Sequence, residues 1–262
     1  MNDSMLNIFI SKESVATRFA KAHFSYVHQA QIQKNVAQHL NRLIKLHVDR
    51  TSFSKVFEIG CGTGNLTHLL LEQLQIKQLF LNDLYPEIIS SFEHIQAEWC
   101  IGDIEKTALP QQLEMCVSSS ALQWMTDLEK LIQRFAIALN PHGYFCFSSY
   151  GPSNFKEIKS LTGQGLDYFS FEQTKELLES NGFEILYAEQ HLDQLYFAHP
   201  KSVLKHIQAT GVSATNSSFR WTKQSLNQFY LNYRQFITTD EQENLVYPLT
   251  YHPIYVIARR KP

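Results

Sequence analysis

Short apolar runs alternate with amphipathic helices from about residue 55 to residue 150, and this alternation constrains the fold more than any other feature of the sequence. The run "KVFEIG" is followed by the helix-periodic "NLTHLLLEQL", and the runs "QLFLND", "EMCVSS" and "GYFCFSS" come later, with helical stretches between them. Strands that alternate with helices in this way are joined by right-handed crossovers into a mainly parallel sheet. The sequence therefore predicts an open, Rossmann-like α/β fold with helices on both faces of the sheet.

The chain before residue 51 has a different pattern. Its apolar residues recur at three-to-four spacing, which predicts an N-terminal helical cap over residues 1–50. Residues 51–262 are then expected to form the main domain. Two aromatic-rich helices between the last two predicted strands indicate a lid-like insertion around residues 199–240, which would cover the carboxyl edge of the sheet.

The C-terminal part of the chain carries weaker patterns. A helix is predicted with Ser170 as its N-cap and Gly182 beyond its end. The segment "EILYAEQHLDQLYF" predicts one long strand over residues 184–197, and "LTYHPIYVIARRKP" predicts a final strand over residues 249–262. The helices of the insertion lie between these two predicted strands.

The composition excludes several classes of protein. An apolar fraction of 44% argues against disorder, and no apolar run approaches the roughly 18 residues of a membrane span. The N-terminus lacks the basic, apolar and small-residue segments of a secretion signal. A net charge of −2 argues against nucleic-acid binding by bulk charge. We expect a soluble protein of the cytoplasm.

The cysteines and histidines do not indicate a metal site. The four cysteines are widely spaced and form no C-x-x-C pair. The 11 histidines are scattered, and no H-x-x-x-H pair shares a helix face beside a carboxylate. We therefore predict reduced, mostly buried thiols and no metal.

The strongest functional signal is a glycine-rich turn between a predicted strand and a predicted helix. Glu58 precedes Gly60, Gly62 and Gly64, whose spacing is G-x-G-x-G. Glycines let the turn close tightly and let a ligand approach the backbone, and the amides at the start of the following helix suit a nucleotide-type ligand. The spacing differs from the G-x-G-x-x-G of dinucleotide sites, and no Lys-Ser or Lys-Thr pair follows as in a P-loop.

Acidic residues near the ends of three successive strands refine this interpretation. Glu58 at the start of the turn suits a cationic ligand better than a phosphate. Asp83 ends the next strand, where its carboxylate can accept hydrogen bonds from both hydroxyls of a ribose. Asp103 follows a third short strand, where it can accept a hydrogen bond from an adenine amino group. The alternative is that these are ordinary strand-end carboxylates and that the glycines only form a turn.

The turn and the three acids together resemble the class I S-adenosylmethionine-dependent methyltransferases, over about Lys55 to Tyr150. The resemblance implies S-adenosylmethionine as cofactor, S-adenosylhomocysteine as product and no metal. The cofactor contacts that it implies are Glu58, Gly60, Cys61, Gly62, Gly64, Asp83, Leu84, Asp103, Ile104 and Ser118.

Segments outside this core resemble one family more closely, the malonyl-[acyl-carrier protein] O-methyltransferases of biotin synthesis. Two departures from the family's pattern are Val27, where an Asp is common, and Ser119, where an Asn is frequent. The matching residues lie in three motifs: Phe19, Ala20, Ala22, Tyr26, Ala30 and Gln33 in the first; Ala121, Leu122, Gln123 and Trp124 in the second; Gly151 and the pair Phe155 and Glu157 in the third.

This resemblance implies a reaction. A methyl group would pass from the sulfonium of the cofactor to the free carboxylate of malonyl on acyl-carrier protein, and the methyl ester would serve as the primer in biotin (pimeloyl) synthesis. A carboxylate is already ionised near neutral pH, so no general base is required. We therefore expect positioning and water exclusion, without a catalytic His–Asp pair.

The resemblance also implies where substrate and partner would bind. Tyr26 is the candidate catalytic residue and a substrate contact, although its periodicity alone would make it an aromatic on a buried helix face. Further substrate contacts are predicted at Gln123 and Trp124, the latter also compatible with a place in the core. Possible clamps for the malonyl carboxylate are Arg18, Lys156 and Arg220, and a basic face for the acidic carrier protein is offered by Lys156, Lys159, Lys201 and Lys205.

Three other functions remain open at this point. The chain could methylate a free small carboxylic acid or another metabolite, without need of a carrier protein. It could be a non-catalytic protein that retains the cofactor pocket. A nicotinamide dehydrogenase is disfavoured by the G-x-G-x-G spacing.

Overall fold

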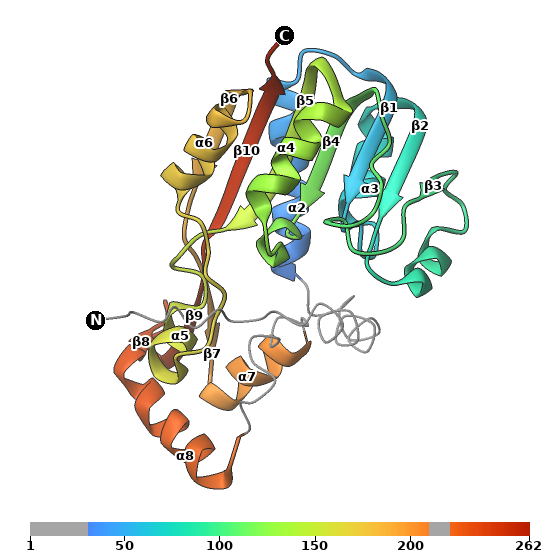
Figure 1. Ribbon diagram of the computed structural model, residues 1–262. Coiled ribbons are helices and arrows are strands. Elements are labelled where there is room, and N and C mark those ends of the chain that lie inside the picture. Colours follow the sequence, from blue (N-terminus) through green and yellow to red (C-terminus); the bar gives the residue numbers. More distant parts are fainter. Residues whose placement is uncertain (1–30, 210–220) are drawn as a thin grey trace. The chain divides into compact units, whose positions relative to one another are not determined.

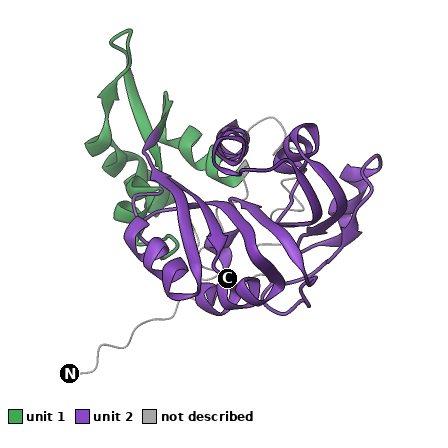
Figure 2. Cartoon of the chain, turned by 90° about the horizontal axis from the view of Figure 1, so that it is seen from above, with its two compact units in different colours: residues 1–29, 155–167, 194–251 green, residues 30–154, 168–193, 252–262 purple. Residues whose placement is uncertain are grey.

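The computed structural model describes residues 31–209 and 221–262 (Figure 1). The chain divides into two compact units, and Figure 2 shows them in different colours. Among the described residues, unit 1 contains Phe155–Asp167 and Gln194–Tyr251, and unit 2 contains the rest. Neither unit is continuous in sequence, because the chain passes between them four times after residue 150.

Unit 2 is built around a seven-stranded sheet with the order β3-β2-β1-β4-β5-β10-β6. Neighbouring strands from β3 to β5 are parallel, and β10 runs antiparallel to both β5 and β6. The predicted mainly parallel α/β sheet is confirmed. The strands are β1 (Ser52–Ile59), β2 (Gln75–Asn82), β3 (Glu98–Trp99), β4 (Leu113–Ser119), β5 (Leu139–Tyr150), β6 (Phe183–Gln190) and β10 (Pro253–Arg260).

Helices cover both faces of this sheet, as predicted. In Figure 1, α2 and α3 lie behind the sheet, and α4 and α6 lie in front of it. Ser170 caps α6 through a reciprocal pair of hydrogen bonds with Gln173, which confirms the predicted helix start. The helical segments of unit 2 are α2 (Gln31–His47), α3 (Asn65–Gln73), α4 (Leu128–Ala138) and α6 (Phe171–Ser180), with the 3-10 turns η1 (Pro86–Phe92) and η2 (Leu122–Trp124).

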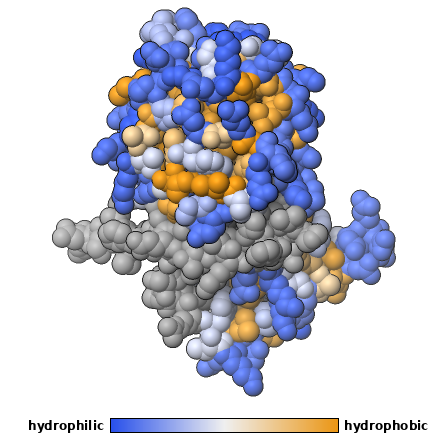
Figure 3. Space-filling model, turned by 90° about the vertical axis from the view of Figure 1, so that its right-hand side faces the viewer, coloured by the Kyte–Doolittle hydropathy of each residue, from blue (hydrophilic) through white to orange (hydrophobic). Residues whose placement is uncertain are grey.

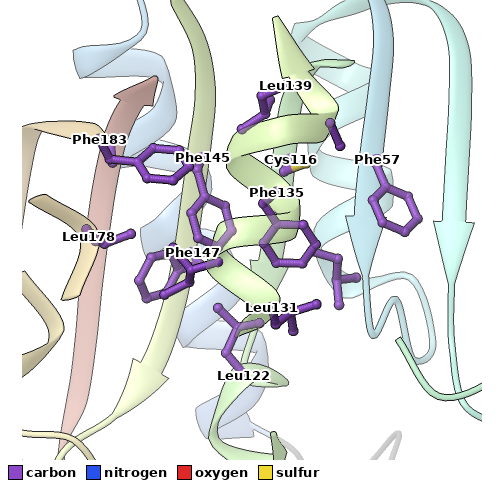
Figure 4. Packing of buried hydrophobic residues seen from close by; sticks show 14 of the residues in the cluster. Phe57, Cys116, Leu122, Leu131, Phe135, Leu139, Phe145, Phe147, Leu178 and Phe183 are labelled. Carbon is purple, nitrogen blue, oxygen red and sulfur yellow. The ribbon is translucent and has the colours of Figure 1, made fainter. Parts of the chain in front are cut away.

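Aromatic residues form the centre of the core between the sheet and its front helices. The ring of Phe145 on β5 lies 5.2 Å from that of Phe135 on α4, 4.8 Å from that of Phe147, and 5.7 Å from that of Phe183 on β6 (Figure 4). All four side chains are almost completely buried. Burial of this much apolar surface fixes the helices on the strands and thereby fixes the loops at the strand ends.

The order of the strands creates a switch point between β1 and β4. From β1 the chain goes outward to β2 and β3, and it then returns to place β4 on the other side of β1. Residue Ile59 pairs with Asn82 on one side and with Ser118 on the other, so the carboxyl ends of the three strands lie in register. Open α/β sheets bind ligands at this kind of position.

Unit 1 contains a small sheet of the order β7-β9-β8 together with helices. The predicted lid around residues 199–240 coincides in sequence with α7, α8 and η3, and its action as a lid stays a prediction. Among the residues that the structure describes, the elements of unit 1 are α5 (Lys156–Thr162), α7 (Pro200–Ala209), α8 (Lys223–Asn232), η3 (Tyr233–Phe236), β8 (Thr238–Thr239) and β9 (Leu245–Tyr251), with β7 (Asp193–Phe197) beginning at the last residue of unit 2.

Two strand predictions are wrong in the same way. The single strand predicted over residues 184–197 is two strands, β6 and β7, in different sheets. The final strand predicted over residues 249–262 is likewise divided at His252 into β9 and β10. At the second break, the carbonyl of His252 accepts a hydrogen bond from Gly151 N (2.8 Å), next to the pairing of Pro253 with Tyr150, so His252 follows β10 onto β5 and leaves the sheet of β9.

Figure 3 shows one face of the molecule, on which hydrophilic residues surround small hydrophobic areas. Within residues 31–209 and 221–262, no helix has the length and apolar character needed to cross a bilayer.

Candidate functional site

The glycine-rich turn joins β1 to α3 as predicted, and its shape requires glycine. Gly60 and Gly62 have φ angles of 64° and 53°, in the left-handed region that residues with a Cβ rarely adopt. A Cβ on Gly60 would lie only 2.5 Å from the Cβ of Ala121, whereas a Cβ on Gly62 would meet nothing within 4 Å. The turn is therefore packed against the β4 end on one side, and its backbone at Gly62 is open to a ligand.

Asp83 lies directly after β2 and fastens this turn. Its Oδ2 accepts a hydrogen bond from Gly62 N (2.9 Å) and its Oδ1 accepts one from Leu84 N (2.7 Å). Burial raises the pKa of Asp83, although the backbone amides of Gly62, Leu84 and Tyr85 oppose the rise. A carboxylate has about four acceptor sites, and the three amides do not use all of them, so Asp83 can still accept from a hydroxyl group of a ligand without releasing the turn.

Glu58, the penultimate residue of β1, is a buried acid with few partners. Its side chain is 1% exposed, and its Oε2 accepts a hydrogen bond from the hydroxyl of Thr67 on α3 (2.6 Å). Burial raises the pKa of Glu58 to about 8, the Thr67 hydroxyl lowers it, and the nearby charge of Asp83 raises it. A positive charge beside such a carboxyl lowers its pKa, so that it releases its proton and pairs with the cation. Glu58 therefore has the properties expected of a residue that binds a cationic ligand.

Asn82 is a residue of the site that the sequence did not reveal. Its side-chain amide donates to the carbonyl of Cys100 (2.6 Å) and to that of Gly102 (3.0 Å). Its own carbonyl accepts from Cys61 N (2.9 Å). Asn82 thus ties the glycine turn to the third strand end. Its position as the last residue of a strand at the switch point is the signal that could have identified it.

Asp103 and Ile104 lie on this third segment. Gly102 N donates to the carbonyl of Asp83 (2.8 Å), which brings the Asp103 segment beside the Asp83 segment. The Asp103 carboxylate accepts from Glu105 N (3.1 Å) and lies 3.6 Å from Lys106 Nζ, so it also stabilises its own turn. The Ile104 side chain is buried in the core, so that only its backbone is available for a cofactor contact.

The end of β4 carries the remaining predicted contacts of unit 2. The hydroxyl of Ser118 is completely buried and donates to the carbonyl of Ile59 (3.1 Å), which joins β4 to the end of β1. Gln123 donates to the carbonyl of Ser120 (2.6 Å), while its Oε1 is buried and has no partner among the described residues. Trp124 is also buried. The unpaired amide oxygen of Gln123 makes it an acceptor available to a ligand.

The structure gathers most of the predicted cofactor residues but not all predicted substrate residues. Glu58, the glycine turn, Asp83 and the segments of Asp103 and Ser118 lie at neighbouring strand ends of unit 2. Lys156 is exposed on α5 of unit 1, and its predicted contact stays a prediction. Tyr26, Arg18 and Arg220 lie outside the described residues.

The state of the cysteines agrees with the sequence prediction. All four cysteines are free, and three are buried as predicted: Cys61, Cys116 and Cys146. Burial raises the pKa of the Cys61 thiol in the turn, so the thiol stays protonated. In the described part of the chain, no three His, Cys, Asp or Glu side chains are grouped so that they could hold a metal ion.

Known proteins match this chain over most of its length. A family model described as a methyltransferase domain matches residues 57–147. A malonyl-[acyl-carrier protein] O-methyltransferase of Acinetobacter baylyi is 48% identical over 254 residues, which are 96% of this chain and 98% of that protein. A protein of the same name from Bacteroides thetaiotaomicron is 38% identical over 265 residues, covering 96% of this chain and 99% of that protein.

A solved structure supports the assignment of the fold. The N-methyltransferase NodS of Bradyrhizobium japonicum, in complex with S-adenosylhomocysteine, matches 86% of this chain and 87% of its own with a TM-score of 0.53. Its sequence identity is 14%, so the likeness concerns the fold. The fold is that of the class I methyltransferases, with the one antiparallel strand β10 inserted between β5 and β6.

Proposed function

This chain belongs to the malonyl-[acyl-carrier protein] O-methyltransferase family, and on this premise we propose that it transfers a methyl group from S-adenosylmethionine to the free carboxylate of malonyl carried on acyl-carrier protein. The observation that carries the proposal is the 48% identity to the Acinetobacter baylyi relative, which extends over 96% of this chain and 98% of the relative. The product would be the malonyl methyl ester, whose apolar end suits a primer for chain extension in biotin synthesis.

The residues at the strand ends of unit 2 fit the proposed cofactor. Gly62 leaves open space beside the backbone of the turn, and Asp83 retains acceptor capacity for ribose hydroxyls. Glu58 supplies a buried carboxyl for the positively charged part of the cofactor. The amides at the start of α3 and the acid Asp103 complete a set of groups that are suited to a charged nucleoside and require no metal.

The work of the protein in this reaction is binding and positioning. S-adenosylmethionine, when bound, supplies a methyl group that its sulfonium charge activates. Asp83 holds Gly62 in place while it accepts hydroxyl groups, and Asn82 holds the neighbouring segment in register. The malonyl carboxylate is ionised near neutral pH and needs no general base, so orientation and exclusion of water account for the catalysis.

The substrate contacts are proposed on the family resemblance and on one feature of unit 2. Gln123 has a buried amide oxygen without a partner among the described residues, at the switch point where ligands bind. An N–H donor of the substrate's carrier arm would satisfy this oxygen. Tyr26 is proposed as the catalytic contact on the resemblance alone.

A methyl-transfer assay tests this function. The protein is incubated with S-adenosylmethionine and malonyl-loaded acyl-carrier protein, and the intact mass of the carrier is measured. We expect a gain of one methylene unit, which alkaline hydrolysis of the ester reverses. Transfer to free malonate but not to the loaded carrier would favour a methyltransferase of small acids. Cofactor binding without transfer to any malonyl thioester would favour a non-catalytic protein.

A further inference from the structure

The helices of unit 1 carry mostly positive charge. Together α5, α7, α8 and η3 contain six Lys and Arg residues and one acidic residue, Glu157, which is 1% exposed. The helical segments of unit 2, in contrast, contain six Lys and Arg residues and six Glu residues. The cations of the unit 1 helices, all exposed, are Lys156, Lys159, Lys201, Lys205, Lys223 and Arg234.

Five of these six cations have no acidic partner within the described residues. Lys159 lies 3.2 Å from Asp167 and is therefore compensated. Unit 2 compensates many of its own surface charges locally, as in the pairs of Lys175 with Glu172 (3.0 Å) and Arg259 with Glu184 (2.9 Å). The charge of the unit 1 helices thus remains available to an external anionic surface.

Two of these cations lie at helix N-termini, where a positive charge is unfavourable. Lys201 and Lys223 lie in the first turns of α7 and α8, and neither first turn contains an acid. In unit 2, α4 and α6 have Glu129 and Glu172 in their first turns. Because the start of a helix carries partial positive charge, a cation there is unfavourable and an acid is favourable. Helix stability therefore does not explain these lysines.

An exposed apolar residue lies among the cations on α8 and η3. Lys223, Leu231 and Arg234 are spaced by eight and three residues, which places them on one face of a helical stretch. Leu231 is 55% exposed, while Phe229 and Tyr233 on the opposite face are buried. Protein-binding surfaces combine an apolar centre with a polar rim, and an exposed leucine on the same face as cations fits this arrangement, whereas a simple polyanion does not need it.

The other two helices are neighbours of α8 within unit 1. α5 contacts both α8 and η3. The ring of His199, directly before α7, lies 5.3 Å from that of Tyr230 on α8, so the start of α7 with Lys201 is next to α8. The exposed cations therefore come from three neighbouring helices of unit 1.

We propose that this region, defined by Lys156, Lys201, Lys205, Lys223, Leu231 and Arg234, is the docking surface for the acidic surface of the acyl-carrier protein. The inference rests on the proposed function, because that function requires a carrier protein. Charge complementarity of this kind speeds association and weakens with salt, while the exposed leucine supplies an apolar contact.

A charge reversal at the two helix starts tests the docking surface. In the double variant Lys201→Glu/Lys223→Glu, we expect the KM for malonyl-loaded carrier protein to rise about tenfold at low salt. The kinetics with malonyl-N-acetylcysteamine, a small thioester without carrier protein, should be unchanged. The Tm should be equal or higher, since each substitution improves the charge at a helix start. A matched control is Lys77→Glu/Lys130→Glu, which makes the same change of charge at exposed positions of unit 2.

The outcomes separate the docking surface from the function. An unchanged KM for the carrier substrate in the Lys201→Glu/Lys223→Glu variant, or an equal rise in the control, would overturn the docking surface. If the wild-type protein methylates neither substrate, the proposed function fails. In that case fluorescence anisotropy with labelled, malonyl-loaded carrier protein still tests docking, and equal affinity of wild type and variant would overturn it.

Discussion

Two buried glutamates, one in each unit, show that burial of an acid does not by itself indicate a functional site. Glu58 and Glu157 are both 1% exposed. Glu157 on α5 accepts two hydrogen bonds from Thr250 on β9, from its amide to Oε2 (3.0 Å) and from its hydroxyl to Oε1 (2.5 Å). Glu58 accepts from one described donor, the hydroxyl of Thr67. The number of donors, more than the burial, distinguishes the two.

The difference follows from the physical cost of a buried charge. A buried carboxylate is stable when donors replace the water that it has lost, as Thr250 does for Glu157. The charge of Glu157 also contributes, after burial, to a raised pKa of Tyr233. Glu58 lacks this compensation, and burial raises its pKa to about 8. Glu157 therefore stabilises unit 1, whereas Glu58 suits the positively charged ligand that we propose for it.

Removal of the Glu157 carboxylate should give the largest effect. In Glu157→Ala the amide and hydroxyl of Thr250 would stay buried without an acceptor, so we expect a loss of about 4 kcal/mol in the free energy of unfolding. Urea denaturation measures it. Glu157→Gln retains one acceptor and should lose about half as much. A loss below about 1 kcal/mol in Glu157→Ala would remove the distinction between the two glutamates.

The stability of the ligand-free protein should depend on pH through Glu58. The carboxyl ionises near its ordinary value of 4.5 when unfolded and near 8 when folded, so the folded protein retains a proton that the unfolded chain has released. The contribution to stability is complete below about pH 4.5 and is lost as the pH rises to about 8. We expect a loss of about 2 kcal/mol between pH 6 and pH 8, relative to Glu58→Gln. Parallel curves for the two proteins would contradict the raised pKa.

The sequence predicted the glycine turn and the strand-end acids because their signals are local. Glu58, Gly60 and Asp83 stand at fixed distances from short apolar runs, and the order of strands and helices brings such positions to one edge. The division of the last predicted strand at His252 depends on long-range contacts and was not predictable. Gly151, about a hundred residues earlier, has no room for a Cβ, which would lie 2.5 Å from the His252 ring.

The role of Glu157 also could not be predicted from local sequence patterns. Its partner Thr250 is 93 residues away in sequence, and only the packing of α5 on β9 brings the two together. Thr67 and Asn82 were missed for a similar reason. Nothing in their immediate neighbours shows that the hydroxyl of Thr67 reaches Glu58 or that the amide of Asn82 reaches the third strand end.

Cofactor binding should release a proton from Glu58. If the ionised carboxylate pairs with the cationic part of the cofactor, affinity should rise about tenfold per pH unit between about pH 6 and pH 7.5. Isothermal titration calorimetry in two buffers with different ionisation enthalpies measures the proton release directly. S-adenosylhomocysteine lacks the sulfonium but retains the ammonium, so an equal slope with both ligands would assign the pairing to the ammonium. A flat profile in wild type, equal to that of Glu58→Gln, would exclude the pairing.

The smallest effect is expected from removal of the Thr67 hydroxyl, which donates a hydrogen bond to Glu58. In Thr67→Val the donor is lost while the shape is kept, so the pKa of Glu58 should rise further and ionisation beside the cofactor should cost about 1 kcal/mol more. Affinity for S-adenosylhomocysteine near neutral pH should fall about fivefold. Thr67→Ser, which restores the hydroxyl, should recover most of it. A Thr67→Val protein with wild-type affinity would show that this hydrogen bond supports only the packing of α3, and that Glu58 differs from Glu157 in degree alone.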